Sequence, residues 1–249
     1  MNDKDYIELL KKQIINSQKP GIKRYLEYLY SLIEKELVGK QILEIGAGAG
    51  LSSNFIKDKN IVLTDILAWE NEKVQGLVNA SELPFNDNHF DSVFSVDAIH
   101  HMEFPVKAIS EACRVVRSGG RVVIIEPYVS FFSFLIYKLF HNEQTTWNYR
   151  IASNGSGISA LASEGEQATL QAILDQTEIV NLIKKLVNKE LRLSRIYLSP
   201  VSFFATGGLS KPLPIPAGMI ALILFIEKLV PAKIMKFISA RQLLIIEVC

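Results

Sequence analysis

Three glycines stand at alternate positions, Gly46, Gly48 and Gly50, directly after the short apolar segment 41–45. Glycine weakens both strands and helices, so three of them in five residues indicate a turn whose backbone something approaches too closely for a Cβ. A helical pattern resumes after the turn, in residues 51–58. A glycine turn between a first strand and a helix lies at the carboxyl end of the sheet, where open α/β folds bind ligands.

Short apolar segments alternate with helical patterns along the chain. Strands are expected at 41–45, 60–65, 76–80, 90–97, 121–127, 192–198 and 242–248. Between them, helical spacing of apolar residues predicts helices over the first forty residues and from Pro105 onward. Alternating strands and helices indicate right-handed βαβ units. We therefore predict an α/β fold: a Rossmann-like, doubly wound, mostly parallel seven-stranded sheet with a helical cap inserted after strand five.

The whole chain of 249 residues is expected to form a single domain. Its predicted parts are N-terminal helices (1–39), a ligand-binding core (40–127), a cap or substrate insertion (128–191), and C-terminal strands with an apolar helix (192–249). Within the insertion, Ser163 and Glu166 have the spacing of a capping box at the start of a helix.

Charge and cysteine content exclude several classes of protein. The 27 basic and 26 acidic residues give a net charge of +1, which provides no electrostatic basis for a nucleic-acid partner. Cys113 and Cys249 have no metal-ligand spacing, so we predict neither a metal site nor a disulfide framework, and expect a reducing compartment. The charged N-terminus lacks a signal-like apolar core, which favours a cytoplasmic location.

Two segments outside the predicted core are unusually apolar, residues 131–140 and 213–226. The second is too short to span a bilayer, which takes about 20 residues. A buried helix explains such a segment, but so does a face that holds a lipid-like substrate or touches a membrane. We expect a small-molecule or lipid-linked acceptor, and leave peripheral membrane contact and oligomeric state open.

The spacing of the glycines indicates which ligand the turn holds. Dinucleotide folds use G-x-G-x-x-G, with the pyrophosphate on the helix N-terminus, whereas this turn reads G-x-G-x-G and continues with Leu51. Glu44 is unfavourable beside a pyrophosphate but suits a ligand that carries an ammonium group. Asp65, at the end of the second strand, can accept two hydrogen bonds from a ribose diol. These features favour S-adenosylmethionine over a dinucleotide.

Residues 41–127 resemble the class I S-adenosylmethionine-dependent methyltransferases, in particular the subgroup related to ubiquinone and menaquinone methyltransferases. LEIGAGAG (43–50) and LTDI (63–66) look like the first two motifs of this family. NASELPFNDNHFDSVFSVDAIHHM (79–102) and CRVVRSGGRVVIIEP (113–127) look like the later ones, although the family's usual aspartate is an asparagine at position 79.

The resemblance implies a cofactor site for S-adenosylmethionine, with S-adenosylhomocysteine as the product. The implied residues, from the methionine end through the ribose and adenine to the sulfonium, are Glu44, Gly46, Gly48, Gly50, Asp65, Ile66, Asn79, Ala80, Ser81, Ser95 and Asp97. Asn79 can still accept a bond from the adenine amino group, without the assistance of a charge.

Candidate catalytic and substrate residues follow the fourth and fifth strands. His100 and His101 are candidates for a general base or for an orienting role, because histidine titrates near neutrality. Aromatic residues beside an arginine are candidates for binding a planar, sugar or acidic acceptor; they are Tyr128, Trp147, Tyr149 and Arg150. An anchoring role for the aromatic residues remains open.

The predicted function is transfer of a methyl group from S-adenosylmethionine to a small-molecule acceptor, hydrophobic or linked to a lipid or sugar, by in-line displacement. Two alternatives remain. One is an NAD(P)-dependent oxidoreductase on the same fold, and the other is a non-catalytic protein that binds the cofactor or associates with membranes.

Overall fold

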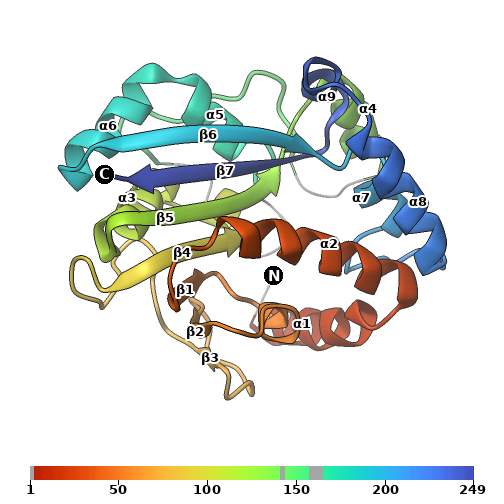
Figure 1. Cartoon of the computed structure of the whole chain (residues 1–249), viewed down its shortest axis with the longest axis horizontal. Coiled ribbons are helices and arrows are strands. Elements are labelled where there is room, and N and C mark those ends of the chain that lie inside the picture. The colour runs from red at the N-terminus through yellow and green to blue at the C-terminus, as the bar shows by residue number, and fades with distance from the viewer. Residues whose placement is uncertain (1–2, 141–143, 157–164) are drawn as a thin grey trace.

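A seven-stranded sheet forms the centre of the computed structural model, which describes residues 3–140, 144–156 and 165–249 (Figure 1). The strands lie in the order β3-β2-β1-β4-β5-β7-β6, and only β7 runs antiparallel to its neighbours. The strand bounds are β1 Gln41–Ile45, β2 Asn60–Thr64, β3 Val74–Gln75, β4 Phe90–Val96, β5 Val116–Pro127, β6 Leu191–Leu198 and β7 Arg241–Val248. This architecture confirms the predicted fold class.

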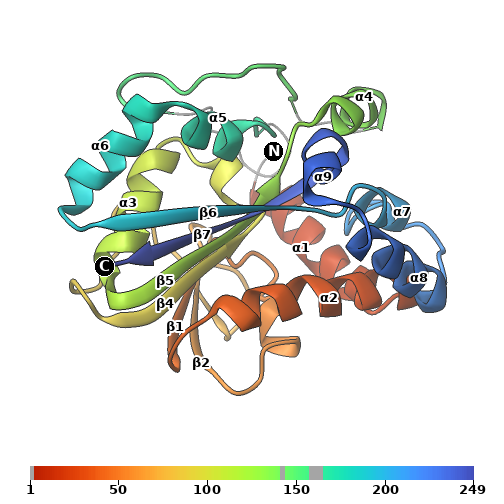
Figure 2. The ribbon, with the colours of Figure 1, turned by 45° about the horizontal axis from the view of Figure 1, so that its top comes forward.

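Helices cover both faces of the sheet (Figure 2). Their bounds are α1 Asp3–Ser17, α2 Pro20–Glu36, α3 Pro105–Val115, α4 Phe131–Phe140, α5 Thr169–Asp175, α6 Thr177–Val187, α7 Ser202–Thr206, α8 Ala217–Lys228 and α9 Ala232–Ile238. Two short 3₁₀ turns, η1 (Leu51–Asn54) and η2 (Ile99–His101), follow β1 and β4. The helices α3, α5 and α6 lie on one face, and α1, α2 and α8 lie on the other.

The continuous apolar strands are explained by burial on both faces. Val122 and Ile124 of β5 pack with α3 and α6, whereas Val123 and Ile125 pack with α2 and α8. Successive side chains of a strand point to opposite faces, so a central strand between two helical layers needs apolar residues at every position.

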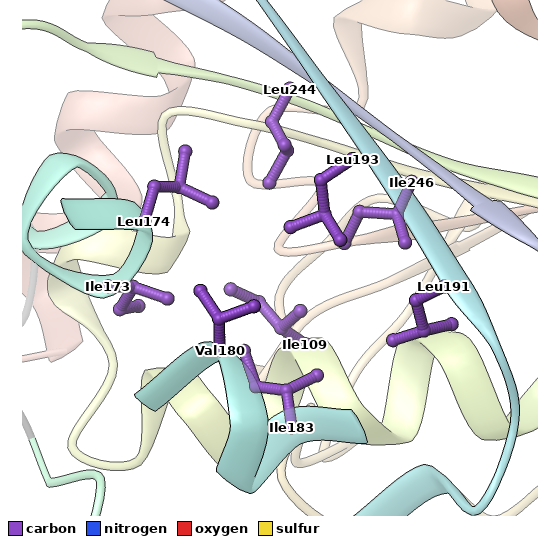
Figure 3. Close-up of a pocket in the computed structure, with 9 residues that line it drawn as sticks. All are labelled: Ile109, Ile173, Leu174, Val180, Ile183, Leu191, Leu193, Leu244 and Ile246. Carbon is purple, nitrogen blue, oxygen red and sulfur yellow. The ribbon is translucent and has the colours of Figure 1, made fainter. Parts of the chain in front are cut away.

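Aliphatic side chains fill the layer between α3, α5, α6 and the sheet (Figure 3). They surround a gap of about 10 Å³ and are Ile109, Ile173, Leu174, Val180, Ile183, Leu191, Leu193, Leu244 and Ile246. No polar side chain borders the gap, and its volume is at the lower limit for one water molecule. We therefore regard it as a packing gap and not as a binding site.

The third strand and the helix after the glycine turn differ from expectation. The strand pairs at Val74–Gln75 instead of 76–80, because Leu77 has a left-handed backbone with φ of 61°, which interrupts the extended conformation; the Val78 N–H still donates to the backbone carbonyl of Asp65. After the glycine turn, only the short turn η1 forms in place of a longer helix. Sequence periodicity does not report these tertiary hydrogen bonds.

The segment 128–191 divides between two places in the fold. Its helix α6 packs against α3 and so belongs to the layer that covers the sheet, whereas α4 packs against α9 at the carboxyl end of β5 (Figure 1). Ser163 of the expected capping box lies outside the described residues. Its partner Glu166 accepts the Thr169 N–H through its backbone carbonyl, at 3.0 Å.

Candidate active site

A cavity of about 1130 Å³ opens at the carboxyl ends of β1, β2 and β4. The glycine turn and the loops after β2 and β4 line one part of it, and α1, α2, α4 and residues 203–213 line the rest. Ligands of open α/β sheets bind at this edge, so the cavity is the candidate site.

The glycines of the turn all have left-handed backbone conformations, with φ of 67° at Gly46, 49° at Gly48 and 66° at Gly50. A Cβ on Gly46 would also collide with the Cβ of Ala98. Gly46 and Gly48 line the cavity, as predicted. Gly50 does not: a Cβ there would face Val74, at 3.0 Å, so this glycine serves the turn and its packing instead of the ligand.

Asp65 ties the end of β2 to the glycine turn and lines the cavity. Its carboxylate accepts the Gly48 N–H at 2.8 Å and the Leu67 N–H at 3.1 Å. Burial raises the pKa of Asp65, and these backbone donors oppose the rise. The neighbouring Ile66 lines the same part of the cavity with 49% of its surface exposed, so an apolar side chain faces space that a planar group can fill.

Glu44 is buried below the turn at the cavity wall, where its carboxyl accepts a short hydrogen bond from the Ser52 hydroxyl. Burial raises its pKa to about 8; the Ser52 hydroxyl opposes the rise, and Asp65 adds to it. Among the described residues, no basic side chain compensates this acid, and a cationic ligand group nearby would favour its ionised form.

Asn79, Ala80 and Ser81 line the cavity beyond Ile66, as the resemblance implies. The Asn79 side-chain oxygen accepts the Ser81 N–H at 2.9 Å, so the asparagine holds its own turn. Its second lone pair and its amide remain chemically suited to a ligand.

Asp97 lines the cavity, but Ser95 does not. Ser95 lies within β4 and is fully buried, and the cavity lining begins at Val96, so the structure does not place Ser95 at the cavity. Asp97 has φ of 53° and accepts a 2.6 Å bond from the Arg241 guanidinium. The Asp97 side chain is 42% exposed and lines the cavity. Desolvation within the site raises the pKa of Asp97, and the positive charge of Arg241 opposes the rise.

His100 and His101 line the cavity with their rings 3.9 Å apart. The Nδ1 of His100 lies 2.5 Å from the buried carboxylate of Glu126, whose other oxygen accepts the N–H groups of Ala98 and Ile99. Burial would raise the pKa of Glu126, but the His100 ring and the Ile99 N–H bring it below its ordinary value. Glu126 was not singled out from the sequence, although it stands in the motif "IIEP".

The four predicted substrate residues lie outside the cavity lining. Tyr128 is buried against Tyr197, and Trp147 packs edge-on against Phe134. Tyr149 packs against the core cluster around α3 and α6, and Arg150 forms an exposed ion pair with Glu178. Their contacts hold the segment after β5 against neighbouring elements, and the structure does not bring these residues to the cavity where the sequence analysis expects them.

Other aromatic residues, which the sequence analysis does not single out, line the cavity. They line the part of the cavity away from the glycine turn and include Tyr25 and Tyr30 of α2, Tyr137 of α4, and Phe203 and Phe204 of α7. Arg241 also lines the cavity. It is buried, its guanidinium carbon lies 4.9 Å from the centroid of the Phe203 ring, and its Nε has no hydrogen-bond partner among the described residues. In the sequence, these aromatic residues have the helical spacing of ordinary core residues, so no sequence pattern distinguishes them as cavity residues.

Comparison with known proteins agrees with this geometry. Residues 43–124 match a family model described as a methyltransferase domain. Over 105 residues, 36% of the chain, the sequence is 31% identical to a phosphatidylethanolamine N-methyltransferase of Cereibacter sphaeroides, of which the match covers 52%. Over 86 residues, 29% of the chain, it is 31% identical to a ubiquinone/menaquinone biosynthesis C-methyltransferase of Chromobacterium violaceum, of which the match covers 35%.

These matches span about a third to a half of each of the two relatives. The fold extends further: a SAM-dependent methyltransferase from Archaeoglobus fulgidus superposes with a TM-score of 0.52, at 14% identity, over 90% of this chain and 94% of that one. S-adenosylmethionine is the cofactor of the family that these comparisons identify. Residues 43–124 are therefore similar to the methyltransferase domain of the class I S-adenosylmethionine-dependent enzymes, and the chain as a whole has the fold of such an enzyme.

Proposed function

We propose that this protein transfers a methyl group from S-adenosylmethionine to a small, largely apolar acceptor bound between α2, α4 and α7. The observation that supports this most strongly is the division of one cavity into two chemically different parts. One part has the glycine turn and the carboxyls of Glu44 and Asp65, and the other has mainly aromatic and aliphatic side chains.

The polar part fits S-adenosylmethionine. Asp65 offers carboxylate oxygens to a ribose diol, and Ile66 offers an apolar surface to an adenine ring. Glu44 gains a compensating charge when a cationic group enters. Gly46 and Gly48 let the ligand approach the backbone closely. When bound, the cofactor supplies the activated methyl group.

The apolar part suits an acceptor with a hydrophobic body. Relatives named for lipid and quinone substrates, the phosphatidylethanolamine and ubiquinone/menaquinone enzymes, support this substrate class. The protein's task is then to align the acceptor atom with the methyl group and to exclude water. The aromatic walls contributed by Tyr25, Tyr137 and Phe204 would do both.

His100 is our candidate for the group that takes a proton from a hydroxyl or activated-carbon acceptor. Its Nδ1 faces the Glu126 carboxylate, so Nδ1 carries the proton and Nε2 is the basic nitrogen. An acceptor amine that is already neutral would need no such base.

The test begins with cofactor binding by titration calorimetry on the full chain, using S-adenosylhomocysteine and, separately, NAD. We expect saturable binding of S-adenosylhomocysteine and none of NAD; the reverse would contradict the proposal. Transfer is then measured with methyl-labelled S-adenosylmethionine and a bacterial lipid extract. Label should enter the organic phase and not the water-soluble fraction.

A variant that fills the apolar part tests the position of the acceptor. Leu209→Trp places a larger side chain on the cavity wall away from the glycine turn. We expect it to reduce transfer to the lipid extract while the affinity for S-adenosylhomocysteine stays unchanged. Leu186→Trp, on the exposed surface of α6, is the matched control and should leave both quantities unchanged. Equal transfer by both variants would show that the acceptor binds elsewhere.

A further inference from the structure

Helices α4, α8 and α9 expose large apolar side chains at one end of the molecule. Both ribbon views show the three helices at the same end of the molecule, where α4 packs against α9 (Figures 1 and 2). Among the exposed residues are Phe131 and Leu139 of α4, Leu222 and Phe225 of α8, and Ile234 and Phe237 of α9, each at least half exposed. We call this surface the apolar face.

The exposed residues are spaced so that each helix has an inner and an outer side. Ile220 and Leu224 of α8 are buried toward α2, whereas Leu222 and Phe225 point outward. An apolar surface of this extent on a folded domain marks an interaction site, because isolated exposed apolar residues are common but a gathered group is not.

The exposed charges in the segment that carries α8 and α9 are of one sign. Residues 199–240 contain four lysines, Lys211, Lys228, Lys233 and Lys236, and a single acid, Glu227. Glu227 is buried, and its carboxylate accepts the N–H groups of Val201 and Ser202 at 2.8 Å and 2.7 Å.

Helix α4 adds Lys138 to these lysines and no acid. The chain as a whole is nearly neutral, so the excess of positive charge is local. Apolar residues bordered by lysines match the boundary between acyl chains and anionic headgroups.

The apolar face lies beside the apolar part of the cavity. Helix α4 lines the cavity with Ile136 and Tyr137 and exposes Phe131 and Leu139 on its outer side. Leu213, just before α8, both lines the cavity and is half exposed. Within the described parts of the chain, no helix has the length and apolarity to cross a bilayer.

We propose that the apolar face docks on the surface of an anionic lipid bilayer, with α4, α8 and α9 lying in the headgroup boundary. Delivery of an acceptor from the bilayer into the adjacent cavity is a consequence that rests on the proposed function. Docking itself does not depend on methyl transfer, so the two can fail separately.

The experiment is flotation of the full chain with vesicles of phosphatidylcholine alone and of phosphatidylcholine mixed with phosphatidylglycerol. We expect the protein to float with the mixed vesicles, and less as the salt concentration rises. The double variant Phe225→Ser/Phe237→Ser should lower the bound fraction about tenfold or more, and Lys233→Gln/Lys236→Gln should remove the preference for anionic lipid.

Matched controls come from α6, on the other helical layer. Leu186→Ser removes an equally exposed apolar side chain, and Lys184→Gln/Lys185→Gln removes two exposed lysines; both should bind vesicles like the wild type. S-adenosylhomocysteine affinity without vesicles, measured on every variant, reports the cofactor site independently.

Two results would overturn the docking proposal. One is a flotation result in which the wild type binds neither kind of vesicle, or in which Phe225→Ser/Phe237→Ser binds vesicles as the wild type does. The other is a concentration-dependent dimer, detected by analytical ultracentrifugation, that Phe225→Ser/Phe237→Ser dissociates while vesicles leave the protein unbound. That outcome would assign the apolar face to a second copy of the chain.

Discussion

Glu126 places one carboxylate oxygen 2.5 Å from Nδ1 of His100, and both side chains are buried at the carboxyl end of the sheet. The second oxygen accepts the backbone N–H groups of Ala98 at 2.9 Å and Ile99 at 2.8 Å. One acid therefore fixes both the ring and the loop that carries it. We regard Glu126 as a positioning residue that acts through His100.

Replacing Glu126 by Gln should separate positioning from cofactor binding. The amide would present an N–H group to Nδ1 and so favour the tautomer in which Nε2 carries the proton. We expect kcat to fall about 10- to 100-fold, as for other groups that orient a catalytic histidine. The affinity for S-adenosylhomocysteine should change little. Steady-state kinetics and calorimetry measure the two quantities.

His100→Asn and His89→Asn form the matched pair for this prediction. His89 is exposed and contacts only the rings of Phe85 and Phe90 among the ring contacts of the described residues, so its loss should leave kcat unchanged. His100→Asn should reduce kcat at least as much as Glu126→Gln does. If His100→Asn leaves kcat unchanged, as His89→Asn should, then His100 has no role as a base.

Asp65→Ala should weaken cofactor binding. The carboxylate faces the cavity, and a bidentate bond to a ribose diol is worth about 1.5–3 kcal/mol, or about 10- to 100-fold in Kd. Asp58→Ala, at an exposed acid before the amino end of β2, is the control and should leave Kd unchanged. Unchanged Kd for Asp65→Ala, in a protein that unfolds as the wild type does, would remove Asp65 from the cofactor site.

Cofactor binding should depend on pH through Glu44. Its pKa is about 8 in the free protein, so the carboxyl is mainly protonated at pH 7, and a cationic ligand favours the ionised form. Binding should release a proton below pH 8, and affinity should rise from pH 6 to 8 by up to about tenfold per unit. Calorimetry in two buffers of different ionisation enthalpy measures that proton.

The Glu44→Gln variant provides the corresponding control. In the free wild type, the pKa is raised from 4.5, so the free energy of unfolding should decrease as the pH rises from 4.5 toward 8. Glu44→Gln should remove this decrease and weaken cofactor binding at pH 8. A wild type whose affinity is constant between pH 6 and 8 would show that Glu44 does not sense the ligand.

Asp97→Asn should destabilise the fold by leaving the buried Arg241 guanidinium without its counter-charge. Asparagine adopts a positive φ readily, so the backbone conformation at 53° is preserved. Since part of Asp97 adjoins the cavity, the loss should lie at or below the lower end of the about 3–5 kcal/mol typical of broken buried pairs.

Chemical denaturation measures the effect of Asp97→Asn. Asp87→Asn, which breaks an exposed ion pair with Arg114, serves for comparison and should cost less than about 1 kcal/mol. Equal losses in the two variants would mean that the Asp97–Arg241 pair contributes no more than a surface pair.

The mostly parallel sheet and the place of the glycine turn after its first strand could be predicted from sequence because local signals specify them. Apolar runs such as 121–127 need burial on both faces, and the glycine turn after 41–45 needs a left-handed backbone whatever surrounds it. The position of Asp65 at the cavity also follows from the sequence, because Asp65 comes directly after the last residue of β2. These properties are set by residues that are neighbours in the chain.

The apolar part of the cavity was decided by tertiary structure alone. Tyr25, Tyr137 and Phe204 come from three distant segments, and each has the spacing of an ordinary core residue; only packing reveals that they border a cavity. The same applies to Trp147 and Arg150, whose sequence suggests a binding role and whose contacts are structural.

The sequence by itself thus determined the sheet, its glycine turn and the chemistry of the cofactor, because backbone conformation and strand burial depend on local composition. The folded structure decided which apolar residues face the core, the cavity or the solvent, and it brought Glu126 to His100 and Arg241 to Asp97. The reason is physical: those contacts join residues separated by 26 and 144 positions, and no local pattern encodes such distances.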